Sequence, residues 1–263
     1  MCTIVVIHGL HSELDTVVAA NRDEFLARDA RPPEVLREAP RVVGGVDEAK
    51  GGTWMGATDR GTFAALTNQR TWSEPDRALR SRGEITLGLL AAGSAAAMVD
   101  FAKSLDVTAY NAFNVMFGDA RHVYVAYGRP DRRRADVHRL EPGVHVLVND
   151  RMGSPEFPKA DRARQLAEPH ARRPWPALQE ALTRMLSDHS TPPPEVLSHP
   201  PEASEWPKEL LVRLQALCTH TELYGTRSAA ILGLSPGRVE RYLHAEGPPC
   251  TASFESVVHL LRG

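Results

Sequence analysis

The chain has 263 residues, 42% of them hydrophobic and 24% charged, and its formal net charge is −2. These values fit a globular protein of one large domain or two small ones, and a nearly neutral chain lacks the positive field that attracts nucleic acid. No apolar stretch approaches the roughly 20 residues of a membrane span, and no signal-peptide pattern is present. The 3 cysteines are too few for a disulfide framework. We therefore expect a cytoplasmic protein with no nucleic-acid partner and no membrane span; the oligomeric state is not predicted.

Paired extended segments occupy the first part of the chain. Residues 3–7 and 16–20 flank a polar turn, and residues 53–56 and 62–67 flank a second one, so each pair predicts a β-hairpin. Next, Ser81-Arg82-Gly83-Glu84 has the spacing of a helix capping box, and apolar residues then recur at helical spacing to about residue 105. This pattern predicts one helix with a buried face over residues 81–105.

Further strands and helices follow in blocks. Strands are predicted at 114–117, 123–127, 137–140 and 144–148, then helices near 160–168 and 176–188. The proline-rich stretch at about 191–207 predicts a surface loop that can serve as a lid, and a last hairpin pairs 224–234 with 238–244. Helices inserted between blocks of antiparallel strands predict an α+β layered fold, in a single domain of residues 1–263.

Cys2, which directly follows the initiator Met1, is the main chemical clue. If Met1 is removed, Cys2 carries both a thiol and a free α-amine, so nucleophile and general base belong to one residue. An α-amine titrates near pKa ~7.7–8.0, close to the value that a general base needs at neutral pH. The nearby Arg22 would favour the thiolate, and Asp23 could orient the new α-ammonium. The alternative is that Cys2 is only a small apolar residue that starts a strand.

Several short motifs occur together along the chain. They are Met1-Cys2, Asn21-Arg22-Asp23-Glu24, Gly51-Gly52-Thr53-Trp54-Met55-Gly56, Ala64-Ala65-Leu66-Thr67-Asn68, Ser81-Arg82-Gly83-Glu84 and Tyr224-Gly225-Thr226-Arg227-Ser228. In this order they resemble the NRDE family, also called the transport-and-Golgi-organisation family, over most of the chain. Members of that family look like N-terminal-nucleophile hydrolases, so the resemblance implies a four-layer αββα sandwich of two antiparallel sheets.

The pattern is also similar to that of bile-salt hydrolases and penicillin V acylases, which cleave linear amides through a processed cysteine. The resemblance implies catalytic roles for Cys2, Arg22, Asp23, Asn68, Asn149 and Arg227, and substrate contacts for Asn21, Glu24, Trp54 and Tyr224. Among these, Cys2 matches the nucleophile, Asn68 and Asn149 resemble the oxyanion-hole asparagines, and Arg227 resembles a late arginine. The chain departs from the pattern at the early arginine, where Ala20 stands and Arg22 is the candidate substitute. As neighbours in a strand, Arg22 and Asp23 should face opposite sides unless the strand has ended or bulged.

Most of these residues also have a structural interpretation. Asn21 and Asn68 could cap turns, and Glu24 could be a surface carboxylate. Arg227 could form an ion pair with Asp23, and Trp54 could be a core or rim aromatic residue. Lys159 resembles a proline–lysine element of the family, but its place predicts an exposed helix start.

We therefore expect a hydrolase that cleaves a C–N amide or a thioester bond of an acylated small molecule. The alternative is a non-catalytic carrier of haem, lipid or acyl-CoA on the same fold, because eukaryotic relatives are implicated in haem mobilisation and in lipid homeostasis. A third interpretation is a scaffold in which the motif residues serve only folding. We predict no cofactor and no metal, with haem a ligand only in the carrier interpretation. Neither Cys-x-x-Cys nor His-Glu-x-x-His occurs, and Cys218-Thr219-His220 alone is too short a ligand set for zinc.

Overall fold

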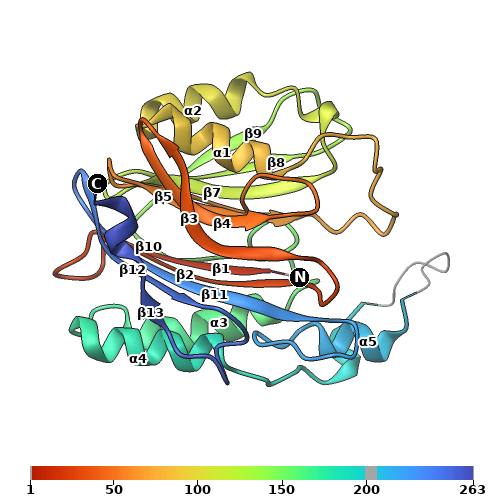
Figure 1. The fold of residues 1–263 in the computed structure, drawn as a ribbon. Helices are drawn as coiled ribbons and strands as arrows, with labels where there is room; N and C mark the ends of the chain where they lie inside the picture. Colours follow the sequence, from red (N-terminus) through yellow and green to blue (C-terminus); the bar gives the residue numbers. More distant parts are fainter. Residues whose placement is uncertain (1, 199–205, 263) are drawn as a thin grey trace.

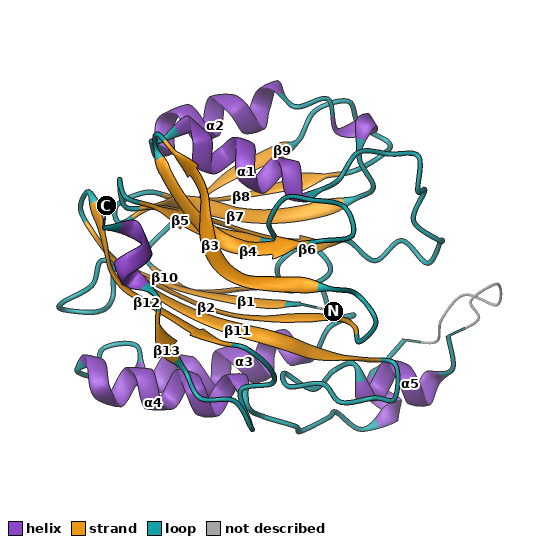
Figure 2. Cartoon of the chain, in the orientation of Figure 1, coloured by secondary structure: helices purple, strands orange, loops and turns teal. Residues whose placement is uncertain are grey.

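The protein is built from two antiparallel sheets packed face to face. The computed structural model describes residues 2–198 and 206–262. Helices cover the outer face of each sheet, which gives the four layers visible in Figures 1 and 2. The predicted αββα sandwich is therefore confirmed.

One sheet contains the amino-terminal strand as the second strand from its edge. It has six strands in the order β10-β1-β2-β11-β12-β13. Their bounds are β1 (Thr3–His8), β2 (Thr16–Phe25), β10 (Gly143–Leu147), β11 (Tyr224–Ser235), β12 (Arg238–Ala245) and β13 (Glu255–Ser256). Below this sheet in Figure 1 lie α3 (Lys159–Ala167), α4 (Trp175–Leu186) and α5 (Lys208–Arg213).

The other sheet is formed by the middle of the chain. It has seven strands in sequential order from β3 to β9. Their bounds are β3 (Ala30–Glu38), β4 (Arg41–Asp47), β5 (Met55–Thr58), β6 (Thr62–Asn68), β7 (Phe113–Asp119), β8 (Val123–Gly128) and β9 (Asp136–Leu140). Helices α1 (Gly83–Ala92) and α2 (Ala95–Ser104) cover it.

The described residues also form four short 3-10 turns, which are η1 (Val107–Ala109), η2 (Glu168–His170), η3 (Pro194–Val196) and η4 (Val258–Leu261).

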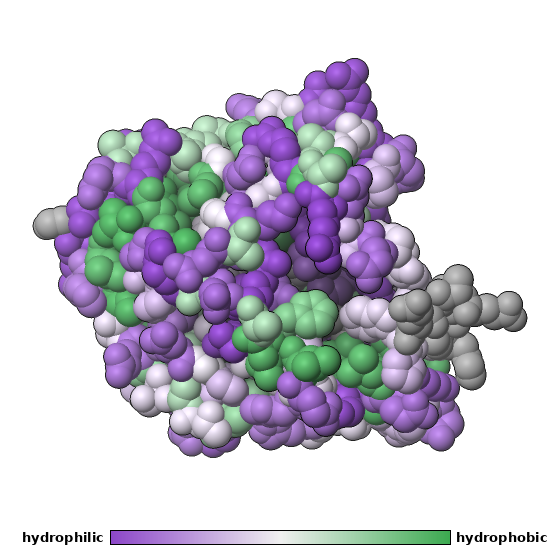
Figure 3. Space-filling view, turned by 45° about the vertical axis from the view of Figure 1, so that its right-hand side comes forward, coloured by the Kyte–Doolittle hydropathy of each residue, from purple (hydrophilic) through white to green (hydrophobic). Residues whose placement is uncertain are grey.

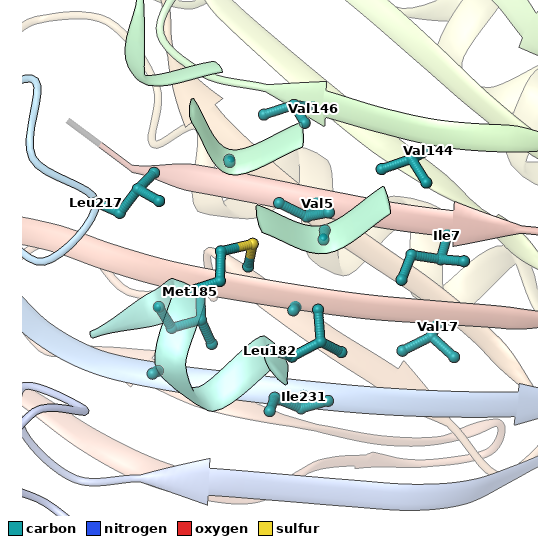
Figure 4. Packing of buried hydrophobic residues seen from close by; sticks show 14 of the residues in the cluster. Val5, Ile7, Val17, Val144, Val146, Leu182, Met185, Leu217 and Ile231 are labelled. Atoms are coloured by element: carbon teal, nitrogen blue, oxygen red, sulfur yellow. The ribbon is translucent and has the colours of Figure 1, made fainter. Parts of the chain in front are cut away.

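Strand β1 is apolar on both faces because both faces are covered. Ile4 and Val6 belong to the core between the two sheets, whereas Val5 and Ile7 belong to the core against α3 and α4. Figure 4 shows Val5 and Ile7 on the same side of the sheet as Met185 of α4. Each fully buried side chain of this size contributes about 1.5–3 kcal/mol relative to an exposed one. This packing fixes β1, and with it the position of Cys2 at the start of the strand.

The three predicted hairpins are confirmed as the pairs β1–β2, β5–β6 and β11–β12. The single helix predicted over residues 81–105 is wrong, because the chain forms α1 and α2 in its place. Gly93 ends α1 with a left-handed φ of 74°, and the Ser94 side chain caps α2 by accepting from the N–H of Ala97. The predicted capping box does not form either, since Arg82 occupies the N-cap without a side-chain cap and Glu84 pairs with Arg80.

Strands β3 and β4 were not predicted from the sequence. Pro32 and Pro33 lie inside β3, and prolines usually argue against a strand because they cannot donate a ladder hydrogen bond. Here β3 is the edge of its sheet and has two register shifts, so the prolines are tolerated. Part of the proline-rich loop predicted at 191–207 lies outside the described residues. No helix in the described parts of the chain is long and apolar enough to cross a membrane.

Candidate functional site

Cys2 lies at the start of β1, between the ends of two neighbouring strands. In β1, Thr3 is opposite Asn21 of β2 and Ile4 is opposite Leu147 of β10. Continued outward, this antiparallel register brings Cys2 next to Arg22 on one side and Asn149 on the other. The Cys2 Sγ lies 3.7 Å from the carbonyl oxygen of Asp23, which agrees with this placement.

Strand alternation divides the neighbours of Cys2 between two faces of the sheet. Arg22 has the same parity as Ala20, which lies in the core between the sheets, and the Asp23 side chain lies on the opposite face, where it meets α3. The two side chains therefore do not enter one pocket, as strand geometry predicts. By the same parity Cys2 and Asn149 belong to the inner face with Arg22. The inner face thus brings together the thiol, an amide and a guanidinium.

Asp23 is the centre of a buried polar cluster on the outer face of the sheet. Its Oδ1 accepts a hydrogen bond of 2.7 Å from the Thr226 hydroxyl, and its Oδ2 lies 3.6 Å from Nζ of Lys159. Its backbone carbonyl accepts a hydrogen bond of 2.7 Å from the Tyr224 hydroxyl. Tyr224, a predicted substrate contact, thus holds the peptide group that also contacts the Cys2 thiol.

Lys159 is fully buried at the start of α3, so the predicted exposed helix start is wrong. Burial lowers the pKa of Lys159, whereas the carboxylate of Asp23 and the thiol of Cys2 raise it. An ammonium in this position requires an anionic partner, and Asp23 provides one. The ion pair of Asp23 predicted with Arg227 is replaced by this pair with Lys159.

Arg227 lies in a β-bulge, because the pairing of β11 with β2 shifts between Thr226 and Ser228. The bulge directs Arg227 to a cavity of about 80 Å³ that Arg22 also lines. Trp54 and His244 are further lining residues, and Cys2 is not one of them. Arg22 is only 6% exposed, and its Nη1 has no hydrogen-bond partner among residues 2–198 and 206–262. A buried guanidinium nitrogen beside a cavity is suited to an anionic or carbonyl group of a ligand.

Asn149 and Asn68 are joined by a hydrogen bond between the two sheets. The Asn149 Nδ2 donates to the carbonyl oxygen of Asn68 at 2.7 Å, and Asn149 is 4% exposed. An amide nitrogen carries two hydrogens, so a second N–H of Asn149 remains for an oxyanion beside Cys2. The Asn68 side chain is exposed, and the residue contributes to this contact through its backbone.

Asn21 and Glu24 have structural contacts. Asn21 is fully buried on the outer face, and its Nδ2 donates to the carbonyl oxygens of Leu186 and Leu217 at 2.8 and 2.9 Å. The Asn21 amide thus fixes α4 and the loop before β11, and its substrate contact stays a prediction. The Glu24 Oε1 accepts from the N–H of Phe25 at 2.9 Å.

Arg82, within the Ser81-Arg82-Gly83-Glu84 motif, is a further residue near the site that the sequence did not indicate. It precedes α1, and its Nη1 donates to the carbonyl oxygen of Ala112 at 3.2 Å. Burial lowers the pKa of Arg82, and the nearby Glu24 and Cys2 groups raise it. The guanidinium is thus held beside Ala112 and interacts electrostatically with the Glu24 and Cys2 groups.

The electrostatic environment of the thiol contains opposing effects. Burial raises the pKa of Cys2, the carboxylate of Asp23 raises it further, and Arg22 lowers it. The net direction is upward, which favours the neutral thiol. A base next to the thiol is therefore needed for nucleophilic chemistry at neutral pH.

The family model described as "Transport and Golgi organisation 2" matches residues 1–242. The Transport and Golgi organization protein 2 homolog of Bos taurus is 31% identical over 229 residues, which cover 82% of this chain and 80% of that protein. The Homo sapiens homolog is 29% identical with the same coverage.

Solved structures with a similar fold include an acid amidase ortholog and a bile acid hydrolase. The Caenorhabditis elegans ortholog of N-acylethanolamine-hydrolyzing acid amidase has a TM-score of 0.54 and 13% identity, covering 90% of this chain and 93% of that one. The C2A mutant of the conjugated bile acid hydrolase from Clostridium perfringens has a TM-score of 0.51 and 12% identity, covering 99% and 94%. At these identities the similarity shows the fold.

Proposed function

This chain belongs to the Transport and Golgi organisation 2 family and has an N-terminal-nucleophile hydrolase-like fold, and from its site we propose that it hydrolyses an amide or thioester bond of an acylated small molecule. The observation that carries the proposal is the position of Cys2. Its thiol lies directly before β1, between Arg22 and Asn149 on the inner face of the sheet.

The proposed reaction begins with removal of Met1, which exposes the α-amine of Cys2. This amine accepts the thiol proton, and the resulting thiolate attacks the acyl carbon. Donors that include Asn149 Nδ2 hold the oxyanion of the tetrahedral intermediate. The ammonium then returns its proton to the leaving amine or thiol, which departs and leaves a thioester on Cys2. Water attacks the thioester, again with the α-amine as base, and releases a carboxylic acid.

Asp23 has a positioning role in this proposal. Its backbone carbonyl contacts the Cys2 thiol at 3.7 Å, so its carboxylate would lie near the α-amine that removal of Met1 exposes on Cys2. The buried pair with Lys159 and the hydrogen bond from Thr226 hold that carboxylate in place. A fixed anion would stabilise the α-ammonium that forms in each half of the reaction.

An apolar acyl group is favoured by the residues that follow the site along β2. Phe25, Leu26 and Leu223 are 54%, 41% and 73% exposed, and we call these three residues the apolar rim. They are adjacent in space, since the N–H of Leu26 donates to the carbonyl of Leu223 at 2.8 Å. Figure 3 shows a hollow in the face of the molecule, with mainly hydrophilic residues around it and an apolar patch beside it. In this proposal the apolar chain lies on the rim and the carbonyl group lies near Cys2, which is opposite Arg22 in the strand register.

The activities named for two proteins of similar fold favour an amide substrate. One acts on N-acylethanolamines and the other on conjugated bile acids. Both descriptions concern acyl groups joined to small polar molecules.

The test is the intact mass of the purified protein before and after exposure to N-acyl amides and acyl thioesters, including acyl-CoA. We expect loss of Met1, an acyl adduct and release of the carboxylic acid. Peptide mapping should locate the adduct on Cys2, with Cys218 and Cys250 as internal controls, and Cys2→Ala should abolish both adduct and turnover. Processed protein that gives neither adduct nor product with any donor would refute the hydrolase. Tight binding of haem or acyl-CoA by such a protein would favour the non-catalytic carrier.

A further inference from the structure

Four potential metal ligands meet on the outer side of the six-stranded sheet, away from the inner face that holds Cys2. They are His189 after α4, Cys218 and His220 in the loop before β11, and Cys250 in the connection from β12 to β13. One ligand atom from each residue lies within 4.8 Å of all the others. We propose that these four residues bind one Zn²⁺ ion as a structural site.

The distances within the cluster fit a tetrahedral zinc. With Zn–S near 2.3 Å and Zn–N near 2.0–2.1 Å, tetrahedral geometry separates two sulfurs by roughly 3.8 Å and a sulfur from a nitrogen by roughly 3.6 Å. The two Sγ atoms of Cys218 and Cys250 are 3.7 Å apart, and His220 Nε2 lies 3.6 and 3.3 Å from them. Three of the four corners therefore already have the required spacing.

His189 supplies the fourth corner. Its Nδ1 lies 2.9 Å from the carbonyl oxygen of Cys218, so a protonated Nδ1 donates there and leaves the lone pair on Nε2. Metal-binding histidines commonly make such a second hydrogen bond to a backbone carbonyl. The His189 and His220 rings lie side by side, with centroids 5.1 Å apart.

The chemistry of the ligand set selects zinc and a closed site. Two thiolates with two imidazoles in a tetrahedron are typical of structural zinc, and four protein ligands leave no position for a substrate. Binding would release the two thiol protons to solvent, so that two thiolates balance the charge of the ion. A disulfide requires sulfurs about 2.05 Å apart, whereas both cysteines are free thiols in this structure.

The loop that holds Cys218 also supports the candidate active site. Leu217 accepts the hydrogen bond from Asn21, and the N–H of Thr219 donates to the Thr226 hydroxyl at 2.9 Å. That hydroxyl donates in turn to Asp23. A zinc ion would therefore join three separate chain segments beneath Asp23 and hold this support in place.

Sequence patterns do not indicate this zinc site, because the four ligands are far apart along the chain. Only Cys218 and His220 are close together, and that pair alone was judged too short a ligand set. His189 and Cys250 reach the cluster only through the packing of α4 and of the β12–β13 connection against the loop.

The experiment is metal analysis of the whole protein purified with a reductant. We expect one equivalent of zinc, and after its replacement by cobalt an absorption band from thiolate-to-cobalt charge transfer. Cys250→Ser and His220→Asn, both at exposed residues, should weaken zinc binding at least ~10-fold and abolish that band. Cys2→Ser and His259→Asn are the matched controls and should keep one equivalent. A chelator should lower the melting temperature of the wild type more than that of Cys250→Ser.

Three results would overturn the zinc site. The first is reduced wild-type protein that lacks zinc and gives no thiolate band on titration with cobalt. The second is a Cys250→Ser protein, folded by circular dichroism, that binds zinc as tightly as the wild type. The third is a disulfide between Cys218 and Cys250 in protein isolated with reductant.

Discussion

Replacing Lys159 with methionine tests the buried ion pair that holds Asp23. The Lys159 Nζ lies 3.6 Å from Oδ2 of Asp23, and both side chains are fully buried. Removing one partner of such a pair costs about 3–5 kcal/mol, because the other charge stays buried without it. We therefore expect the free energy of unfolding of Lys159→Met to fall by about 3–5 kcal/mol. At about 2–4 °C per kcal/mol for a chain of this size, the melting temperature should fall by ~6–20 °C.

A double variant separates the charge effect from the loss of packing. In Lys159→Met with Asp23→Asn, both charges are gone and the asparagine Oδ1 can still accept from Thr226. Neutral replacement of a buried pair is often without cost, so the double variant should lie within about 1 kcal/mol of the wild type. Urea unfolding followed by circular dichroism measures both values. Lys103→Met, at an exposed lysine, is the control and should change stability by less than about 0.5 kcal/mol.

The pH dependence gives a second readout of the same pair. Burial lowers the pKa of Lys159 below its unfolded value of ~10.4, so the unfolded chain binds more protons between the two values. Stability therefore gains a contribution that rises with pH through that range, and Lys159→Met should lose it. The reasoning is refuted if Lys159→Met costs less than about 1 kcal/mol, or if Asp23→Asn fails to restore stability in the double variant.

Three further predictions concern the inner face and its cavity. Asn149→Ala should slow acylation of the amino-terminal thiol by about 100-fold, because an oxyanion donor is lost. Asn68→Ala should change the acylation rate less than about 3-fold, since Asn68 makes the contact through its backbone. Comparable losses of rate in both variants would contradict these roles. Arg82→Met should raise the pKa of that thiol and slow its alkylation at neutral pH roughly 10-fold. Arg80→Met, at an exposed ion-pair residue, is the control and should leave the alkylation rate unchanged. Equal alkylation rates in Arg82→Met and the wild type would exclude an effect of the Arg82 guanidinium on the thiol. Burial lowers the pKa of His244 to about 4, so the folded state stays neutral while the unfolded state binds a proton below ~6.5. Between those values the wild type should lose on the order of 3 kcal/mol more stability than His244→Gln, and parallel pH–stability curves would show that His244 is accessible to water.

Local patterns account for the parts of the fold that were predicted correctly. The hairpins β1–β2 and β11–β12 follow from apolar runs with polar turns between them, and α3 and α4 follow from helical spacing. The errors arose where one local signal was overridden. Gly93 and Ser94 end one helix and begin the next within a continuous apolar pattern. Pro32 and Pro33 argued against a strand, but an edge strand forms there.

Sequence patterns alone establish the family, the alternation of β2 that separates Arg22 from Asp23, and the place of Cys2 before an apolar strand. Tertiary structure decided which partners these groups meet. Lys159 was predicted to be exposed, but it is buried against Asp23 because α3 packs on the sheet. The physical reason is the separation along the chain of the residues involved. Side-chain periodicity depends on neighbours within a few residues. A buried charge pair or a four-ligand cluster forms only when distant segments pack together and exclude water around it.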